Sequence, residues 1–192
     1  MKIIGIAGTN GSGKDTLSEM LAKDYGWLFV SSSRDLIIPE LKRLGLPLER
    51  GQMSALSAKW RREDPGGAVV KRAVQKYQQA NLDHQYNGLV ISSLRHPWEV
   101  DSVHELGGKV VWVDAEPKVR YDRIFNRGQG DKDMKTFEQF LAEEQAEMNH
   151  SGDEATLNMA AVKAKADIFL SNDTDDIEEF KTAAQKALKS IL

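Results

Sequence analysis

The sequence contains no cysteine among its 192 residues. Disulfide bonds and thiolate metal sites are therefore excluded, and the composition suits a reducing compartment. No apolar run is long enough to cross a bilayer, and the chain enters a predicted strand at once, without a signal peptide. The net charge of −3 gives no basic field for nucleic acid. We therefore expect a soluble, cytoplasmic protein that binds neither membranes nor nucleic acid.

What the sequence does contain is a phosphate-binding motif close to its start. The motif has GxxxxGK spacing and lies between an apolar run at residues 3–7 and a helical pattern that begins at Leu17. Glycines let backbone N–H groups surround an anion, and the helix N-terminus adds a favourable dipole. Lys14 would place a cation on the outer phosphates. The motif predicts a nucleoside-triphosphate site formed by Gly8, Thr9, Asn10, Gly11, Ser12, Gly13, Lys14, Asp15 and Thr16.

One position of the motif departs from the usual pattern. The residue after Lys14 is ordinarily a serine or threonine whose hydroxyl holds Mg²⁺, and here it is Asp15, followed by Thr16. An aspartate is a hard oxygen ligand that could hold the metal directly or through water. It could equally be a carboxylate favoured in the first turn of a helix. Both interpretations of Asp15 remain open from the sequence.

Apolar runs alternate with helical patterns along the whole chain. A capping box of Thr136 and Gln139 opens one predicted helix, and another is predicted over residues 154–164. This alternation predicts one α/β domain over residues 1–192, with a parallel sheet covered by helices on both faces. Ligands of such sheets bind at the carboxyl ends of the strands. The predicted strands lie at residues 3–7, 27–30, 88–94, 110–113 and 168–170.

Polar residues just past the strands should share that edge with the motif. Arg95 follows the third predicted strand, and a guanidinium beside a phosphate loop makes bidentate contacts with a second phosphate. The alternative is an ion pair between Arg95 and Glu99, four residues later on a helix. Other residues that we expect at this edge are Ser33, Arg34, Asp35, Asp114 and Asn172.

Three arginines form a stripe on the helix predicted after the fourth strand. Arg120, Arg123 and Arg127 have i, i+3 and i+7 spacing, and a charged, glycine-containing segment at residues 126–135 follows them. This pattern suits a mobile lid with arginines free of the core that closes over a triphosphate. The alternative is an ordinary solvated face. Arg61 and Arg62 likewise could hold an acceptor's charge or form a solvated helix end.

Other nucleotide-dependent classes lack support in the sequence. No Asn-Lys-x-Asp stretch is present to bind guanine, which argues against a switch GTPase. The third predicted strand ends in Ser92 and Ser93, where a mechanical ATPase has the aspartate of its metal site. The four histidines are scattered, and no pair has metal-ligand spacing. A phosphotransferase with an acceptor site and a lid remains.

These residues resemble the P-loop nucleoside-monophosphate-kinase-like family. Within it the chain looks most like proteins described as dephospho-CoA-kinase-like or deoxynucleotide-monophosphate-kinase-like. The resemblance runs nearly end to end and rests on GTNGSGKDT at residues 8–16 and on residues 30–67, 90–128 and 166–173. The first motif is specific for nucleotide binding. The other segments are specific for the group but say little about which substrate its members phosphorylate.

The resemblance implies a three-layer fold whose five-stranded parallel sheet is ordered 2-3-1-4-5. It implies ATP and Mg²⁺ at residues 8–16, an acceptor-binding segment at about residues 31–67 and a lid at about residues 120–150. By the same resemblance, Arg95 would face the acceptor phosphate and Asn172 would lie where backbone groups pass the adenine. Ser33, Arg34 and Asp35 would begin the acceptor-binding segment, and the lid would carry Arg123 and Arg127.

Two departures leave the acceptor open. Dephospho-CoA kinases carry an Asp-x-Asp-like signature where this chain has three serines at residues 31–33. Deoxynucleotide kinases often show Asp-Val-Arg where this chain has Ser93-Leu94-Arg95. Our hypothesis is ATP-dependent phosphorylation of a nucleoside or deoxynucleoside monophosphate. The alternatives are a dephospho-CoA-kinase-like or other small-molecule kinase, and a nucleotide-binding regulator with slow ATP hydrolysis.

Overall fold

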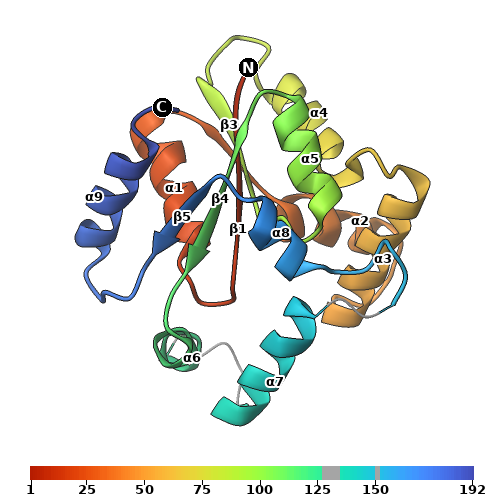
Figure 1. Cartoon of the computed structure of the whole chain (residues 1–192). Coiled ribbons are helices and arrows are strands. Elements are labelled where there is room, and N and C mark those ends of the chain that lie inside the picture. The colour runs from red at the N-terminus through yellow and green to blue at the C-terminus, as the bar shows by residue number, and fades with distance from the viewer. Residues whose placement is uncertain (127–134, 150–151) are drawn as a thin grey trace.

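A computed structural model of the chain describes residues 1–126, 135–149 and 152–192. Its strands form a single parallel sheet in the order β2-β3-β1-β4-β5 (Figure 1). The prediction of a five-stranded parallel sheet ordered 2-3-1-4-5 is confirmed. The strands are β1 Lys2–Gly8, β2 Leu28–Ser31, β3 Gly88–Ser92, β4 Lys109–Asp114 and β5 Ile168–Ser171.

Alternating side chains of the sheet build two separate hydrophobic cores. In β1, Ile4 and Ile6 belong to one core, whereas Ile3 and Ala7 belong to the other. Period-two alternation sends neighbouring side chains to opposite faces, so a central strand must be apolar throughout. Helices lie on both sides of the sheet in Figure 1. The first core includes α1 Lys14–Tyr25 and α9 Ile177–Leu188, and the second α4 Ala68–Ala80, α5 Pro97–Glu105 and α8 Met159–Lys165.

A third cluster of buried side chains holds the predicted acceptor segment against the domain. After β2 the chain forms a π-helix, η1 Ser32–Ile37, which runs into α2 Ile38–Arg43, and α3 Arg50–Glu63 follows. Leu41 of α2 and Trp60 of α3 are 0% and 5% exposed and pack with Val69 of α4. Trp60 is therefore a core residue, and α3 is fixed beside the carboxyl edge of the sheet.

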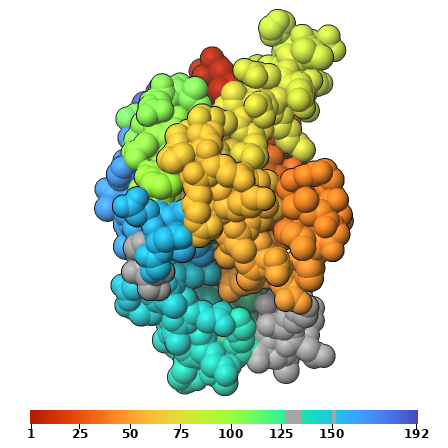
Figure 2. Space-filling view, turned by 90° about the vertical axis from the view of Figure 1, so that its right-hand side faces the viewer, coloured from red at the N-terminus to blue at the C-terminus, as the bar shows by residue number. Residues whose placement is uncertain are grey.

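Two further helices, α6 Pro117–Asn126 and α7 Phe137–Met148, lie at the end of the molecule toward which β1 runs (Figure 1). Thr136 and Gln139 form the predicted capping box at the start of α7. The space-filling view shows the cyan surface of α7 below the orange and yellow surface of α2 and α3 (Figure 2). Most of the predicted mobile segment, together with Arg127, lies outside the described residues. Among the described helices, none is long and apolar enough to cross a membrane.

The helix predicted over residues 154–164 is wrong in its first half. In the structure, α8 begins only at Met159, because the Asn158 side chain accepts a hydrogen bond from the backbone of Ala161 and caps the helix. The preceding residues form a turn in which Asp153 accepts hydrogen bonds from the backbone N–H groups of Ala155 and Thr156. This turn carries residues 153–158 back over α3, so the segment contributes to the edge where ligands bind.

At the opposite end of the sheet, Asp167 joins three elements. Its carboxylate accepts hydrogen bonds from the Val110 N–H at 2.8 Å and from Lys109 Nζ at 2.9 Å, and it lies 2.8 Å from Nε2 of His104. Burial alone would raise the pKa of Asp167, but these contacts outweigh burial and lower the pKa from 3.8 to about 2. Near this end, Lys2 Nζ also donates to the carbonyl oxygen of Leu192.

Asp167 should therefore stabilise the fold in a pH-dependent way. A depressed folded-state pKa gives stability that is fully present above about pH 4 and is lost as the pH falls toward 2. We expect Asp167→Asn to lower the free energy of unfolding at pH 7, and the difference from the unsubstituted protein to shrink toward pH 2. Urea titrations at several pH values measure it, with the exposed Asp83→Asn as the control. A difference that does not change with pH contradicts the assignment.

Candidate functional site

The predicted phosphate loop lies at the carboxyl end of β1 and leads directly into α1. Gly11 and Gly13 have φ values of +80° and +95°, a region that favours glycine. A Cβ atom on Gly13 would lie 2.3 Å from Nδ2 of Asn172, and one on Gly11 would lie 2.7 Å from the carbonyl oxygen of Arg120. Both glycines are therefore required by backbone conformation and by close packing.

The donors of this loop fit an anion. The N-cap residue of α1 is Gly13, which has no side chain to cap the N–H groups of the first turn. The hydroxyl of Ser12 is fully buried and has no hydrogen-bond partner among the described residues. Lys14 adds a cation whose Nζ lies 3.3 Å from the carbonyl oxygen of Thr9. Uncapped amides, an unpaired hydroxyl and an ammonium group form the kind of donor set that a phosphate group accepts from.

Side chains from the ends of β4 and β5 hold the loop in place. Asn172 donates from Nδ2 to the carbonyl oxygen of Ser12 at 2.8 Å, and Thr9 donates its hydroxyl to Asp114 at 2.8 Å. Asn172 is 7% exposed. Asn172 lies at the carboxyl edge of the sheet, as we expected, and its side chain supports the backbone of the loop.

Asp114 is the main anchor of the loop. Its burial would raise the pKa of the carboxyl group, but hydrogen bonds from Thr9, Trp112 and the Ala115 N–H, together with the nearby Arg120 charge, lower it below its ordinary value. The carboxylate is consequently ionised at neutral pH. It fixes Thr9 as a charged acceptor and is not a group that exchanges protons near pH 7.

Asp15, in the first turn of α1, lies next to the carboxyl end of β3. A mechanical ATPase has its metal-site aspartate at this strand end, where this chain has Ser92 and Ser93. Oδ1 of Asp15 accepts a hydrogen bond from the hydroxyl of Ser92 at 3.0 Å, and the Asp15 side chain is exposed. Ser93, the residue after Ser92, has a φ of +69°, which is a strained backbone conformation for a residue other than glycine. Magnesium is usually held by one or two carboxylates with water and substrate phosphates, and this oxygen-rich corner fits that pattern. The described residues contain no group of three potential metal-ligating His, Cys, Asp or Glu side chains.

Two cavities flank the loop. A cavity of about 240 Å³ includes Gly13, Thr16, Arg123 and Asn172 in its lining. A larger one of about 720 Å³ lies between the loop, the start of α3, and helices α6 and α7. The larger cavity is lined by Asn10, Gly11, Lys14, Leu48, Glu49, Arg50, Met53, Tyr121, Ile124, Phe125, Lys135, Phe140, Glu143 and Glu144.

The arginines of α6 differ from the expected solvent-accessible stripe. Arg120 is 2% exposed and pairs with Glu144 of α7, so the expectation that it is free of the core is wrong. Arg123 donates to the carbonyl oxygens of Asn172 at 2.8 Å and Thr174 at 2.5 Å. It therefore lines the smaller cavity, on the β5 side of the phosphate loop. Arg120 and Arg123 face neighbouring elements because α6 packs between α7 and the segment after β5.

Arg95 reaches from the end of β3 to the phosphate loop. Its Nη2 lies 3.3 Å from Oδ1 of Asn10, and its Nη1 lies 2.9 Å from a carboxylate oxygen of Glu147 on α7. The alternative side-chain pair with Glu99 does not form; Glu99 accepts the backbone N–H of Arg95 instead, at 2.7 Å. The guanidinium of Arg95 is thus placed between the loop and α7.

Arg61 is not at the surface of this site. It is 3% exposed, and its Nε and Nη2 donate to Glu99 at 3.0 and 2.8 Å. Its Nη1 donates to the carbonyl oxygen of Ala155. Both sequence-based interpretations of Arg61, acceptor binding and a solvated helix end, therefore fail to describe it, because its donors are used inside the protein. Arg62 is exposed and pairs with Asp153.

The residues after β2 have mainly local contacts. Asp35 accepts a hydrogen bond from the backbone N–H of Ser31 at 2.7 Å, and Arg34 pairs with Asp35 and lies over the ring of Phe29. Neither of the two cavities beside the loop is lined by Ser33, Arg34 or Asp35. The structure brings together the loop, Arg95, Arg123 and Asn172, and leaves this segment and Arg61 outside.

Comparison with known proteins agrees with this geometry. A family model described as an AAA domain matches residues 4–150. A UPF0200 protein of Sulfurisphaera tokodaii is 31% identical over 197 residues, which span all of this chain and 98% of the relative. The chain belongs to the AAA domain family and to the UPF0200 proteins.

Solved structures with the same fold as this UPF0200 protein include sugar-acid and shikimate kinases. A gluconokinase of Sinorhizobium meliloti superposes with a TM-score of 0.55 at 15% identity, over 98% of this chain and 92% of its own. A shikimate kinase of Bacteroides thetaiotaomicron gives 0.53 at 15% identity, over 98% and 97%. The P-loop kinase fold is thereby confirmed. The nucleoside-monophosphate-kinase-like group, with its substrate, stays a prediction.

Sequence reasoning missed several residues of the UPF0200 cleft. Glu143 pairs with Lys135 and Arg50, and Glu147 pairs with Arg50 and Arg95. The i, i+4 spacing of Glu143 and Glu147 on one helix was a usable signal, because such residues share a face. Nothing local indicated that this face turns toward the phosphate loop.

The buried pair of Arg61 and Glu99 should carry a large share of the stability of this region. Removing one partner leaves an uncompensated buried charge, which costs about 3–5 kcal/mol. We expect Arg61→Ala to lower the free energy of unfolding by roughly that amount in urea titrations. Arg43→Ala is the control, because Arg43 is exposed and its ion-pair partner among the described residues is Glu40; it should change the free energy of unfolding far less. Equal effects of the two substitutions would contradict the assignment.

Proposed function

We propose that this protein is an ATP-dependent phosphotransferase that passes a phosphoryl group to a phosphate-bearing small molecule. The observation that carries the proposal is the position of Arg95, whose guanidinium contacts both the phosphate loop and α7 beside the 720 Å³ cavity. A nucleotide-binding protein without an acceptor needs no second cation there. A kinase does, because donor and acceptor phosphates repel one another and must be held close together.

The donor would extend along the loop toward the smaller cavity. Lys14 and the uncapped amides of α1 would hold its outer phosphates, and Asp15 or Thr16 would hold Mg²⁺. Bound Mg²⁺ would neutralise phosphate charge. The nucleoside would occupy the 240 Å³ cavity, where Asn172 supports the loop and the Arg123 charge lies on the donor side. Arg127 lies outside the described residues, and its role in a lid stays a prediction.

The acceptor would occupy the larger cavity. The walls combine cations with Tyr121, Phe125 and Phe140, whose rings offer stacking surfaces to a flat base. We therefore favour a nucleoside or deoxynucleoside monophosphate over an acyclic acceptor. In this arrangement the residues of the protein do no covalent chemistry: they align two phosphates, and Arg95 offsets the charge that accumulates between them.

A coupled assay across nucleoside monophosphates, dephospho-CoA and sugar acids tests the proposal. With the best acceptor, Arg95→Ala should lower kcat/KM for that acceptor by about 30- to 100-fold, the size of a lost charge-assisted contact, while the KM for ATP changes less than about twofold. Arg43→Ala is the matched control. ATP turnover that no acceptor accelerates, and that Arg95→Ala leaves unchanged, would contradict a kinase and favour a regulator with slow hydrolysis.

A second substitution tests the metal role of Asp15. If its carboxylate helps to hold Mg²⁺, Asp15→Ser should shift the Mg²⁺ concentration for half-maximal ATP turnover by about threefold or more. Asp24→Ser, at the exposed end of the same helix, should leave it unchanged. An unchanged Mg²⁺ dependence in both variants would identify Asp15 as a helix-start carboxylate only.

A further inference from the structure

The carboxylate of Glu147 lies between two arginines. Its Oε2 is 2.9 Å from Nη1 of Arg95, and its Oε1 is 3.6 Å from Nη2 of Arg50. Arg50 comes from the first turn of α3 and Arg95 from the end of β3, so the two guanidinium groups converge on one anion from different elements. The side chains of Arg95 and Glu147 are only 23% and 22% exposed. The Arg50 side chain is 57% exposed. A partly buried arginine and an exposed one that converge on the same carboxylate can together bind an oxyanion.

The neighbouring glutamates of α7 form no ion pair with Arg95 in the part of the chain that the structure describes. Glu144 pairs with the buried Arg120, and Glu143 pairs with Lys135 at 2.6 and 2.7 Å and with Arg50 at 3.4 Å. Glu147 is therefore the described glutamate of α7 that contacts the arginine bound to the phosphate loop. Its carboxylate occupies the position that an acceptor's anion needs.

We propose that Glu147 is an internal competitor for the acceptor's anion at the Arg50–Arg95 site, and that a dianionic phosphoryl group of the acceptor displaces it. The inference rests on the proposed function and extends it. A carboxylate ligand that replaced Glu147 would exchange one monoanion for another and leave Glu147 without its partners, so it would gain nothing. A phosphoryl dianion brings twice the charge and three acceptor oxygens, and can satisfy both arginines at once. Arg50 becomes a second acceptor-binding arginine.

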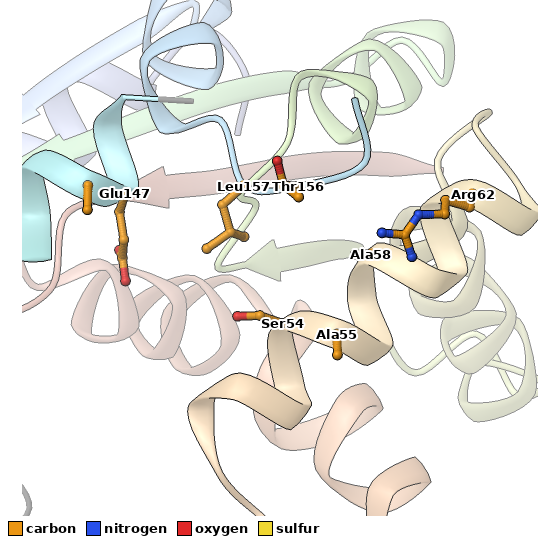
Figure 3. Close-up of a pocket in the computed structure, with 8 residues that line it drawn as sticks. Ser54, Ala55, Ala58, Arg62, Glu147, Thr156 and Leu157 are labelled. Carbon is orange, nitrogen blue, oxygen red and sulfur yellow. The ribbon is translucent and has the colours of Figure 1, made fainter. Parts of the chain in front are cut away.

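A further cavity lies on the far side of Glu147 from the larger cavity in which the acceptor would lie. It has a volume of about 390 Å³, and Figure 3 shows it between α3 and the segment that precedes α8. Ser54 and Ala55 of α3 lie on one side of it, Leu157 lies across from them, and Glu147 lies at one end. Because Arg50 lines the larger cavity and Glu147 lines this one, their ion pair lies between the two. Displacing Glu147 would therefore connect the 390 Å³ cavity with the 720 Å³ cavity that would hold the acceptor.

Anion binding, measured without turnover, tests the inference. The protein is saturated with Mg²⁺ and a non-hydrolysable ATP analogue so that the phosphate loop is filled. Methyl phosphate and acetate are then titrated at pH 8, where a phosphate monoester is a dianion. Glu147→Gln should bind methyl phosphate about fivefold more tightly than the unsubstituted protein, and acetate more tightly by about the same factor, because a competitor weakens every ligand of its site equally. Arg50→Ala should weaken methyl phosphate binding.

Glu138→Gln, an exposed substitution at the start of the same helix, controls for the charge of α7 and should change neither affinity. Glu147→Asp, which keeps the charge on a shorter side chain, provides a folded comparison if the amide variant is unstable, and should also bind methyl phosphate more tightly. Weaker or unchanged methyl phosphate binding in the Glu147 variants would overturn the inference. If the affinities change as expected but the coupled assay shows no phosphorylated acceptor, the anion site is retained and the proposed kinase activity is rejected.

Discussion

One buried carboxylate determines the geometry of the cleft. Glu99 is 1% exposed and accepts four hydrogen bonds, two from the guanidinium of Arg61 and two from the backbone N–H groups of Arg95 and His96. It thereby ties α3 to the end of β3, and Arg61 extends the connection to Ala155. Burying a charge is costly unless its hydrogen bonds are complete, as they are here. The position of Arg95 beside the phosphate loop depends on this arrangement, because Glu99 holds the backbone that carries the arginine.

The positively charged side chains of the cleft form ion pairs with glutamates of α7. Three glutamates of α7 pair with cations that come from α3, α6 and the end of β3. The pairs keep cations close to the loop without leaving an uncompensated positive surface, in keeping with a chain of net charge −3. They also make α7 part of the cleft wall. Any anion that enters must compete with the protein's own carboxylates, which favours ligands with high charge density.

Predictions from the sequence were correct where the contacts are local in the sequence and failed where the partners lie far apart in it. The strand order came from family resemblance, whereas the phosphate loop and the Thr136–Gln139 capping box are local patterns and were predicted correctly. Arg61 and Arg120 were misjudged because their carboxylate partners lie 38 and 24 residues away, and a helical wheel shows only which residues share a face. The early start predicted for α8 failed for a related reason. The turn at residues 153–158 packs on α3, and its own composition does not reveal that contact.

The two chain ends have a consequence for how this domain can be combined with others. Lys2 contacts Leu192, and Figure 1 shows both ends of the chain at the edge of the sheet opposite α6 and α7. Proteins whose ends lie close together and away from their ligands tolerate circular permutation and insertion into other chains. A fluorescent reporter, an immobilising surface or a second domain attached at either end would therefore stand clear of the cleft, and joining the two ends through a short linker would leave the architecture of the sheet intact.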